Sequence, residues 1–149
     1  MKILLAIDGT KHSEDIIDFL KKINLSGPIE LWIISVIDMA IHSSIDIFAD
    51  SHSTATEIEN AVIENAVKSM ETSSKMIGNI FENKHISIVK ELLYGSPESR
   101  IVEKAKQIQA DLVIVGSHGY NRWESLLLGS VSDTLLHHAP CSVLVFMNL

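Results

Sequence analysis

The sequence predicts a single α/β domain in which helices cover both faces of a parallel sheet. Short runs of Ile, Leu and Val alternate with longer segments whose apolar residues recur at helical spacing, and this alternation is typical of a three-layer fold. The chain is 46% hydrophobic but only 5% aromatic, which suits the aliphatic core of a buried parallel sheet. A length of 149 residues favours one domain, covering residues 1–149.

Five strands and four helices follow from these patterns. We expect strands at residues 3–7, 29–37, 86–93, 112–115 and 142–147. We expect helices at about 14–23, 56–81, 97–108 and 130–138. The helix near residue 97 has the clearest start, because Ser96 suits an N-cap and Pro97 suits the first helical position.

The longest predicted helix has one apolar face, which we expect to pack on the core. Its members are Ile58, Val62, Ala66, Met70, Ile77 and Phe81. Before this helix, residues 38–55 show no clear period and are rich in Ser, His and Asp. Connections this long are uncommon in compact domains unless they have a function. We interpret the stretch as a mobile loop, with a lid or a dimer arm as alternatives.

Composition excludes several function classes. The formal net charge is −7 and Lys and Arg do not cluster, so nucleic acid and anionic membranes are poor candidates as partners. Cys141 is the sole cysteine, which excludes an intrachain disulfide and fits a reducing compartment. The apolar N-terminal run is too short for a signal peptide, and no run approaches the length of a membrane span. We therefore expect a cytoplasmic protein.

The most informative stretch begins with the predicted strand at residues 112–115. The strand ends at Gly116, Gly119 follows, and Gly129-Ser130 then opens a helix. Glycines allow close backbone approach, and free N–H groups at a helix start attract anions, so the pattern indicates a phosphate site. A tight turn without a ligand is the alternative. If the first and fourth strands are neighbours, Asp8 and this loop face one crevice at the carboxyl edge of the sheet.

Other constellations are absent or incomplete. The first strand is not followed by a Gly-x-Gly-x-x-Gly fingerprint, and no Walker A pattern occurs. Ser117 and His118 do not form a nucleophile elbow, and the seven histidines lack metal-ligand spacing. Mg²⁺ held mainly by nucleotide phosphates needs few protein ligands, and Asp8 is the candidate carboxylate. The alternative for Asp8 is a turn residue that caps its own backbone.

The spacing Gly116-x2-Gly119-x9-Gly129-Ser130 resembles the nucleotide-binding signature of the universal stress protein family. The resemblance continues in register over nearly the whole chain, at residues 3–10, 94–101, 110–116 and 140–145. It implies a Rossmann-like sheet of order 3-2-1-4-5, a homodimer formed through the last strand, and membership of the ATP-binding branch. The motif assigns no role to Arg122 or Trp123.

The resemblance also implies a set of nucleotide contacts. Adenine and ribose would lie against Ala6, Ile7 and Asp8, with Val36 packed on the base. The ribose and phosphate side would be lined by Val115, Gly116, His118 and Gly119. The phosphates would be held at the helix start by Gly129, Ser130, Val131 and Ser132.

These features favour an ATP-binding module of the stress response, with Mg²⁺ or Mn²⁺ held by the phosphates. No residue stands out as a base for activating water, so we expect no enzyme and at most slow ATP hydrolysis. One alternative is a protein-interaction module of the same fold that binds no nucleotide; another, an adenylate-transferring enzyme, lacks its expected motifs. The apolar strand at 143–146 is the predicted dimer edge. The sequence specifies no protein partner beyond a second copy.

Overall fold

The computed structural model describes residues 1–8, 12–23, 25, 27–38, 52–82, 85–117 and 129–147, with backbone alone at 12–13 and 52–55. The strands are β1 (Lys2–Ala6), β2 (Ile29–Ile37), β3 (Ile86–Tyr94), β4 (Leu112–Gly116) and β5 (Ser142–Phe146). The helices are α1 (His12–Leu20), α3 (His52–Ile80), α4 (Pro97–Ile108) and α5 (Ser130–His138). Each predicted strand and helix is therefore present, with strand bounds shifted by at most one residue.

All five strands are parallel, in the order β3-β2-β1-β4-β5. The central strand β1 pairs with β2 on one side and with β4 on the other, so that Leu4 lies opposite both Trp32 and Val113. This pairing confirms the adjacency of the first and fourth strands, on which the predicted crevice depends. The winding of the chain reverses between these two strands, which is where sheets of this kind bind ligands.

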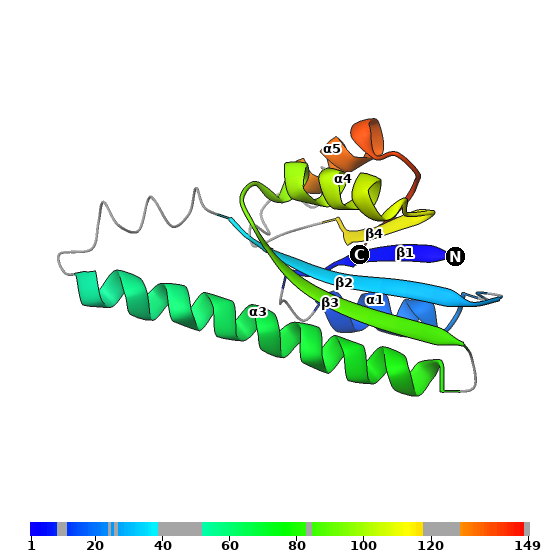
Figure 1. Cartoon of the computed structure of the whole chain (residues 1–149), viewed down its shortest axis with the longest axis horizontal. Helices are drawn as coiled ribbons and strands as arrows, with labels where there is room; N and C mark the ends of the chain where they lie inside the picture. Colours follow the sequence, from blue (N-terminus) through cyan, green and yellow to red (C-terminus); the bar gives the residue numbers. More distant parts are fainter. Residues whose placement is uncertain are drawn as a thin grey trace.

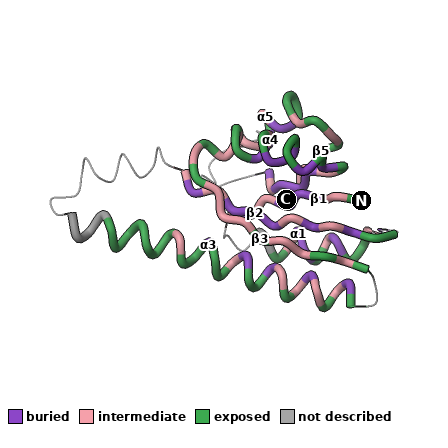
Figure 2. The backbone as a smooth tube through the Cα atoms, viewed as in Figure 1, coloured by how far each residue is buried: buried purple, intermediate pink, exposed green. Residues whose placement is uncertain are grey.

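The helices form two outer layers. In Figure 1, α4 and α5 lie on one face of the sheet, and α1 and α3 lie on the other. Each layer encloses its own apolar cluster, one around Ile17 and Ile77 and the other around Ile101 and Leu135. The burial colours of Figure 2 follow this division, with purple residues along the strands and on the inner sides of the helices. The three-layer prediction is thus confirmed.

The first half of α3 differs from the prediction. The helix runs past the carboxyl ends of the strands, as Figure 1 shows, so its first turns have no sheet beneath them. Ala66 and Met70 are buried, but Ile58 and Val62 are each 38% exposed. Placing these two in the core was wrong, because helical periodicity shows which residues share a face but not where the sheet beneath that face ends.

Several helix ends also differ, and α1 begins at His12, two residues before the predicted start. The helix α3 begins at His52, four residues before the predicted start, because its first turn is polar and gives no apolar period. The helix α1 ends at Leu20, since the chain tightens there: the N–H of Ile23 donates to the carbonyl of Leu20 at 3.3 Å. Most of the predicted loop, residues 39–51, lies outside the described residues. No helix among the described residues is long and apolar enough to cross a membrane.

Candidate nucleotide site at the carboxyl edge of the sheet

The candidate site lies where β1 and β4 end side by side. Beyond β1, the N–H of Ile7 still donates to the carbonyl of Ile34 at 2.9 Å, and the half-buried Asp8 follows. Beyond β4, the N–H of Ser117 donates to the carbonyl of Phe146 at 2.8 Å. Hydrogen bonds of the sheet therefore extend one residue past both strands and hold their ends in place.

The start of α5 is anchored to the end of β4. The N–H of Gly129 donates to the carbonyl of Ser117 at 3.0 Å, although eleven residues separate the two in the chain. The buried hydroxyl of Ser132 donates to the carbonyl of Gly129 at 3.0 Å and lies 3.5 Å from that of Ser117. The Ser132 hydroxyl is therefore occupied by backbone carbonyls, and the group of Ser132 that suits an anion is the backbone N–H.

Gly129 occupies the N-cap of α5, with φ −64° and ψ 160°. This backbone conformation is open to any residue, so the need for glycine comes from space. A Cβ at this position would lie 3.1 Å from the carbonyl oxygen of Ser117. Glycine also makes no side-chain cap, which leaves the N–H groups of the first turn without a capping partner from this residue.

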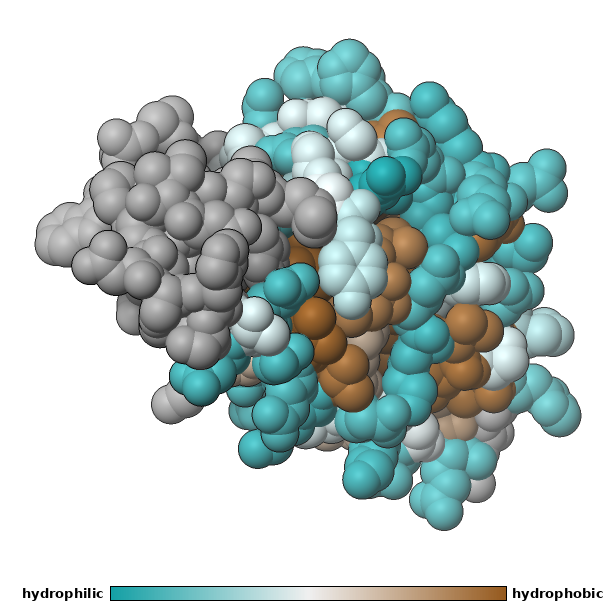
Figure 3. All heavy atoms as spheres, turned by 60° about the vertical axis from the view of Figure 1, so that its left-hand side comes forward, coloured by the Kyte–Doolittle hydropathy of each residue, from teal (hydrophilic) through white to brown (hydrophobic). Residues whose placement is uncertain are grey.

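Apolar side chains gather beside this helix start. Ala6, Val36 and Val131 pack against the cluster that contains the buried Val115, on the face covered by α4 and α5. The side chain of Ile7 is 5% exposed and belongs to the cluster on the opposite face. Alternation along the strand separates Ala6 from Ile7, so that the Ile7 side chain is on the other side of the sheet. Figure 3, which brings this edge forward, shows brown apolar side chains between teal polar ones.

The structure therefore brings together most of the residues singled out from the sequence. Ala6, Val36, Val115 and Gly116 lie at or next to the ends of three neighbouring strands, together with Asp8. The start of α5 contributes Gly129, Ser130, Val131 and Ser132. Of the other three, Ile7 has its side chain on the opposite face of the sheet, and His118 and Gly119 lie outside the described residues, as do Arg122 and Trp123.

A glutamate that the sequence argument did not place at the site joins the starts of α4 and α5. The Oε1 atom of Glu98 accepts a hydrogen bond from the Ser130 hydroxyl at 2.8 Å, and Oε2 accepts one from the Ser96 hydroxyl at 2.7 Å. Ser96 is the N-cap residue of α4 and Pro97 begins the helix, as predicted, but the Ser96 hydroxyl donates to this carboxylate and makes no side-chain cap bond to the backbone. No motif signalled Glu98, since only the fold brings residues 98 and 130 together.

The pKa of Glu98 is lowered from its usual value. The largest cause is the hydrogen bond from the Ser96 hydroxyl, followed by a bond from the backbone of Glu98 itself; the Ser130 hydroxyl adds to them, and partial burial opposes them. Its position in the first turn of α4 also favours the charged form. Glu98 is therefore an ionised carboxylate at neutral pH.

The described residues contain no group of three or more His, Cys, Asp or Glu side chains that would hold a metal ion. Mg²⁺ carried by a nucleotide does not need such a group, because phosphate oxygens and water fill most of its coordination sphere. Asp8, the carboxylate that the sequence predicts for this role, lies two residues beyond β1.

Comparison with known proteins identifies the family of this chain. A model of the universal stress protein family matches residues 1–146. The chain belongs to the universal stress protein family. A relative from Staphylococcus aureus (strain USA300), itself named as a universal stress protein, is 30% identical over 144 residues, which span 96% of this chain and 81% of the relative.

Solved structures share the fold over almost the full length. Hypothetical protein MJ0577 aligns with a TM-score of 0.81 and 24% identity, covering 99% of this chain and 96% of its own. A universal stress protein in complex with cAMP aligns with a TM-score of 0.64 and 18% identity, covering 98% and 95%. An Arabidopsis thaliana family protein with AMP bound aligns with a TM-score of 0.66 and 13% identity, covering 98% and 90%.

Proposed function

We propose that this universal stress protein is a cytoplasmic ATP-binding module whose bound nucleotide controls its interactions in a stress response. The observation that carries the proposal is the position of the start of α5. Gly129 caps this helix and is hydrogen-bonded to Ser117, the residue after β4. The neighbour of β4 in the sheet is β1, and the winding of the chain reverses between these two strands. The cAMP and AMP complexes of the two structural neighbours support an adenine nucleotide as the ligand class.

Two groups of residues suit two different parts of the proposed nucleotide. The apolar side chains of Ala6, Val36 and Val115 suit a planar base, which gains from losing contact with water. The first N–H groups of α5 suit phosphate oxygens, because they have no partner within the helix and lie at its positive end. When bound, Mg²⁺ or Mn²⁺ would neutralise phosphate charge next to Asp8. We assign no catalytic residue, and we expect binding with at most slow hydrolysis.

The first test is the identity of any ligand that the protein retains. Protein purified without added nucleotide is denatured, and the released small molecules are identified by chromatography and mass spectrometry. We expect ATP, or its products ADP and AMP, at close to one per chain, or else saturable binding when ATP and Mg²⁺ are titrated into empty protein. An empty protein that also binds no ATP on titration would overturn the proposal.

A nucleotide-free interaction module remains the second candidate, and one observation favours it. The Ser130 hydroxyl, a predicted phosphate ligand, already donates to Glu98 within the chain. In that case the glycines serve only the fold, and substitutions at Gly129 change stability without any effect on nucleotide binding. Rapid ATP turnover that disappears when Ser130 is replaced would contradict both the binding module and this alternative.

We also propose a homodimer formed through β5. In the described chain this strand pairs only with β4, and its apolar residues at 143–146 are only half-buried. An unpaired apolar edge favours association with another strand. We expect twice the chain mass by sedimentation at micromolar concentration, and a shift toward monomer in Met147→Glu, next to β5. Val67→Glu, on the distant α3, is the control; a wild-type monomer would refute the dimer.

A further inference from the structure

One carboxylate occupies the junction between two helix starts. Glu98 lies in the first turn of α4, and its Oε1 atom accepts the hydrogen bond from Ser130, the first residue of α5. The second oxygen is held by Ser96 at 2.7 Å, so both ends of the carboxylate are fixed. A negative group of this chain is thus in contact with the helix start that the proposed function gives to phosphates.

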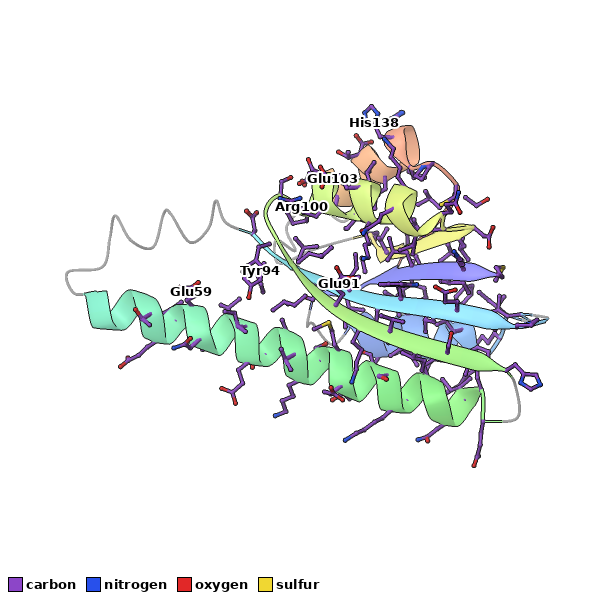
Figure 4. All side chains as sticks on the ribbon, viewed as in Figure 1. Glu59, Glu91, Tyr94, Arg100, Glu103 and His138 are labelled. Carbon is purple, nitrogen blue, oxygen red and sulfur yellow. The ribbon has the colours of Figure 1, made fainter. Side chains whose placement is uncertain are left out.

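No cation neutralises this charge among the ion pairs of the described part of α4. There, Arg100 pairs with Glu103 at 2.9 Å, and Lys104 pairs with Glu91 at 2.5 Å. Figure 4 shows Arg100 and Glu103 close together near the start of α4. The hydroxyl and backbone bonds to Glu98 stabilise the charged form without removing its charge.

This arrangement opposes a polyphosphate in two ways. A serine hydroxyl has a single proton, so Ser130 cannot donate to Glu98 and to a phosphate at the same time. In addition, the Glu98 carboxylate and the phosphates carry charges of the same sign and repel each other, and the repulsion grows with the charge of the ligand. A bound divalent cation removes part of that charge, whereas a neutral nucleoside does not experience the repulsion.

We propose that Glu98 is a specificity-determining residue of the nucleotide site, which competes with the terminal phosphates for Ser130 and the start of α5. It thereby makes tight ATP binding depend on a divalent cation, and it leaves the binding of the adenosine portion unchanged. This inference rests on the proposed nucleotide function and goes beyond it, because it assigns the dependence on ligand charge to one side chain.

The test measures affinities for ATP and adenosine by calorimetry, with Mg²⁺ and with EDTA, for the wild type and Glu98→Gln. Glutamine keeps the size of the side chain and removes its charge; its amide oxygen can still accept from one serine hydroxyl, and its NH2 group can donate to the oxygen of the other. We expect metal-free ATP to bind roughly tenfold more tightly to the variant, the gain to shrink to about threefold or less with Mg²⁺, and adenosine affinity to stay within about twofold.

Glu103→Gln is the matched control, since it removes one carboxylate from the same helix at an exposed position. It should leave all four affinities unchanged. If Glu98→Gln binds metal-free ATP no better than the wild type, or gains as much for adenosine as for ATP, the inference is wrong while the nucleotide function stands. If none of the three proteins binds any adenine nucleotide, the proposed function fails, and this inference fails with it.

Discussion

Replacing Gly129 by valine is expected to lower the affinity for ATP about a hundredfold, through the loss of two or so charge-assisted hydrogen bonds to phosphate. A Cβ at this position would lie 3.1 Å from the carbonyl oxygen of Ser117, and valine adds two further carbons. Because that oxygen belongs to the backbone at the end of β4, it cannot rotate away. The start of α5 must therefore move, and its N–H groups move with it.

ATP titration by calorimetry checks this expectation, with thermal unfolding measured in parallel to show that the variant is folded. Gly78→Ala is the matched control, since a Cβ there meets nothing within 4 Å and the residue lies within α3. It should bind ATP as the wild type does and gain about 0.5–1 kcal/mol in stability from the higher helix propensity of alanine. Unchanged ATP affinity in Gly129→Val would remove α5 from the proposed site.

The second large effect concerns stability. The side chain of Lys104 is only 6% exposed, its Nζ lies 2.5 Å from the Oε2 atom of Glu91, and the same Nζ lies 4.3 Å from the centre of the Trp32 ring. Replacing Glu91 by alanine leaves this buried ammonium without its counter-charge. We expect the free energy of unfolding to fall by about 2 kcal/mol, less than the full cost of a broken buried pair because Glu91 is itself partly exposed.

Urea unfolding measures this loss of stability, and a neighbouring ion pair supplies the control. Lys90 precedes Glu91 on β3 and pairs with Glu71 of α3 at 2.5 Å, but neither side chain of this pair is buried, since Lys90 is 35% and Glu71 is 49% exposed. Glu71→Ala should therefore unfold within error of the wild type. Lys104→Met should lower the free energy of unfolding less than Glu91→Ala does. It removes the buried charge itself, and only the partly exposed Glu91 carboxylate is left without a partner. Equal losses for Glu91→Ala and Glu71→Ala would show that burial does not strengthen the first pair.

Much of the fold follows from local pattern. Runs of β-branched and aliphatic residues define the strands, and Gly129-Ser130 marks the start of α5 at the residue where the structure has it. These features depend on residues close together in the chain, so they are visible in the sequence. The glycine spacing and the apolar strand ends also indicated the carboxyl edge as the site.

Features that depend on distant residues came from the tertiary structure. Periodicity placed Ile58 and Val62 on the core face of α3, but the sheet ends before it reaches them, and both are 38% exposed. The sequence does not show that β1 pairs with β4, because the strands are more than 100 residues apart in the chain; the sheet order does. The bond between Lys104 and Glu91 likewise joins a helix to a strand of the sheet it covers.

The candidate site also has features that are visible in the sequence and features that depend on the tertiary structure. By itself the sequence determined the fold class, the family resemblance and the glycine that starts α5, because each is written in contiguous residues or fixed spacings. Only the tertiary structure decided that Glu98 meets Ser130, since the fold has to bring two helix starts together before their side chains can bond. A hydrogen bond extends only about 3 Å, so its partners are set by the packing of the elements and not by their separation along the chain.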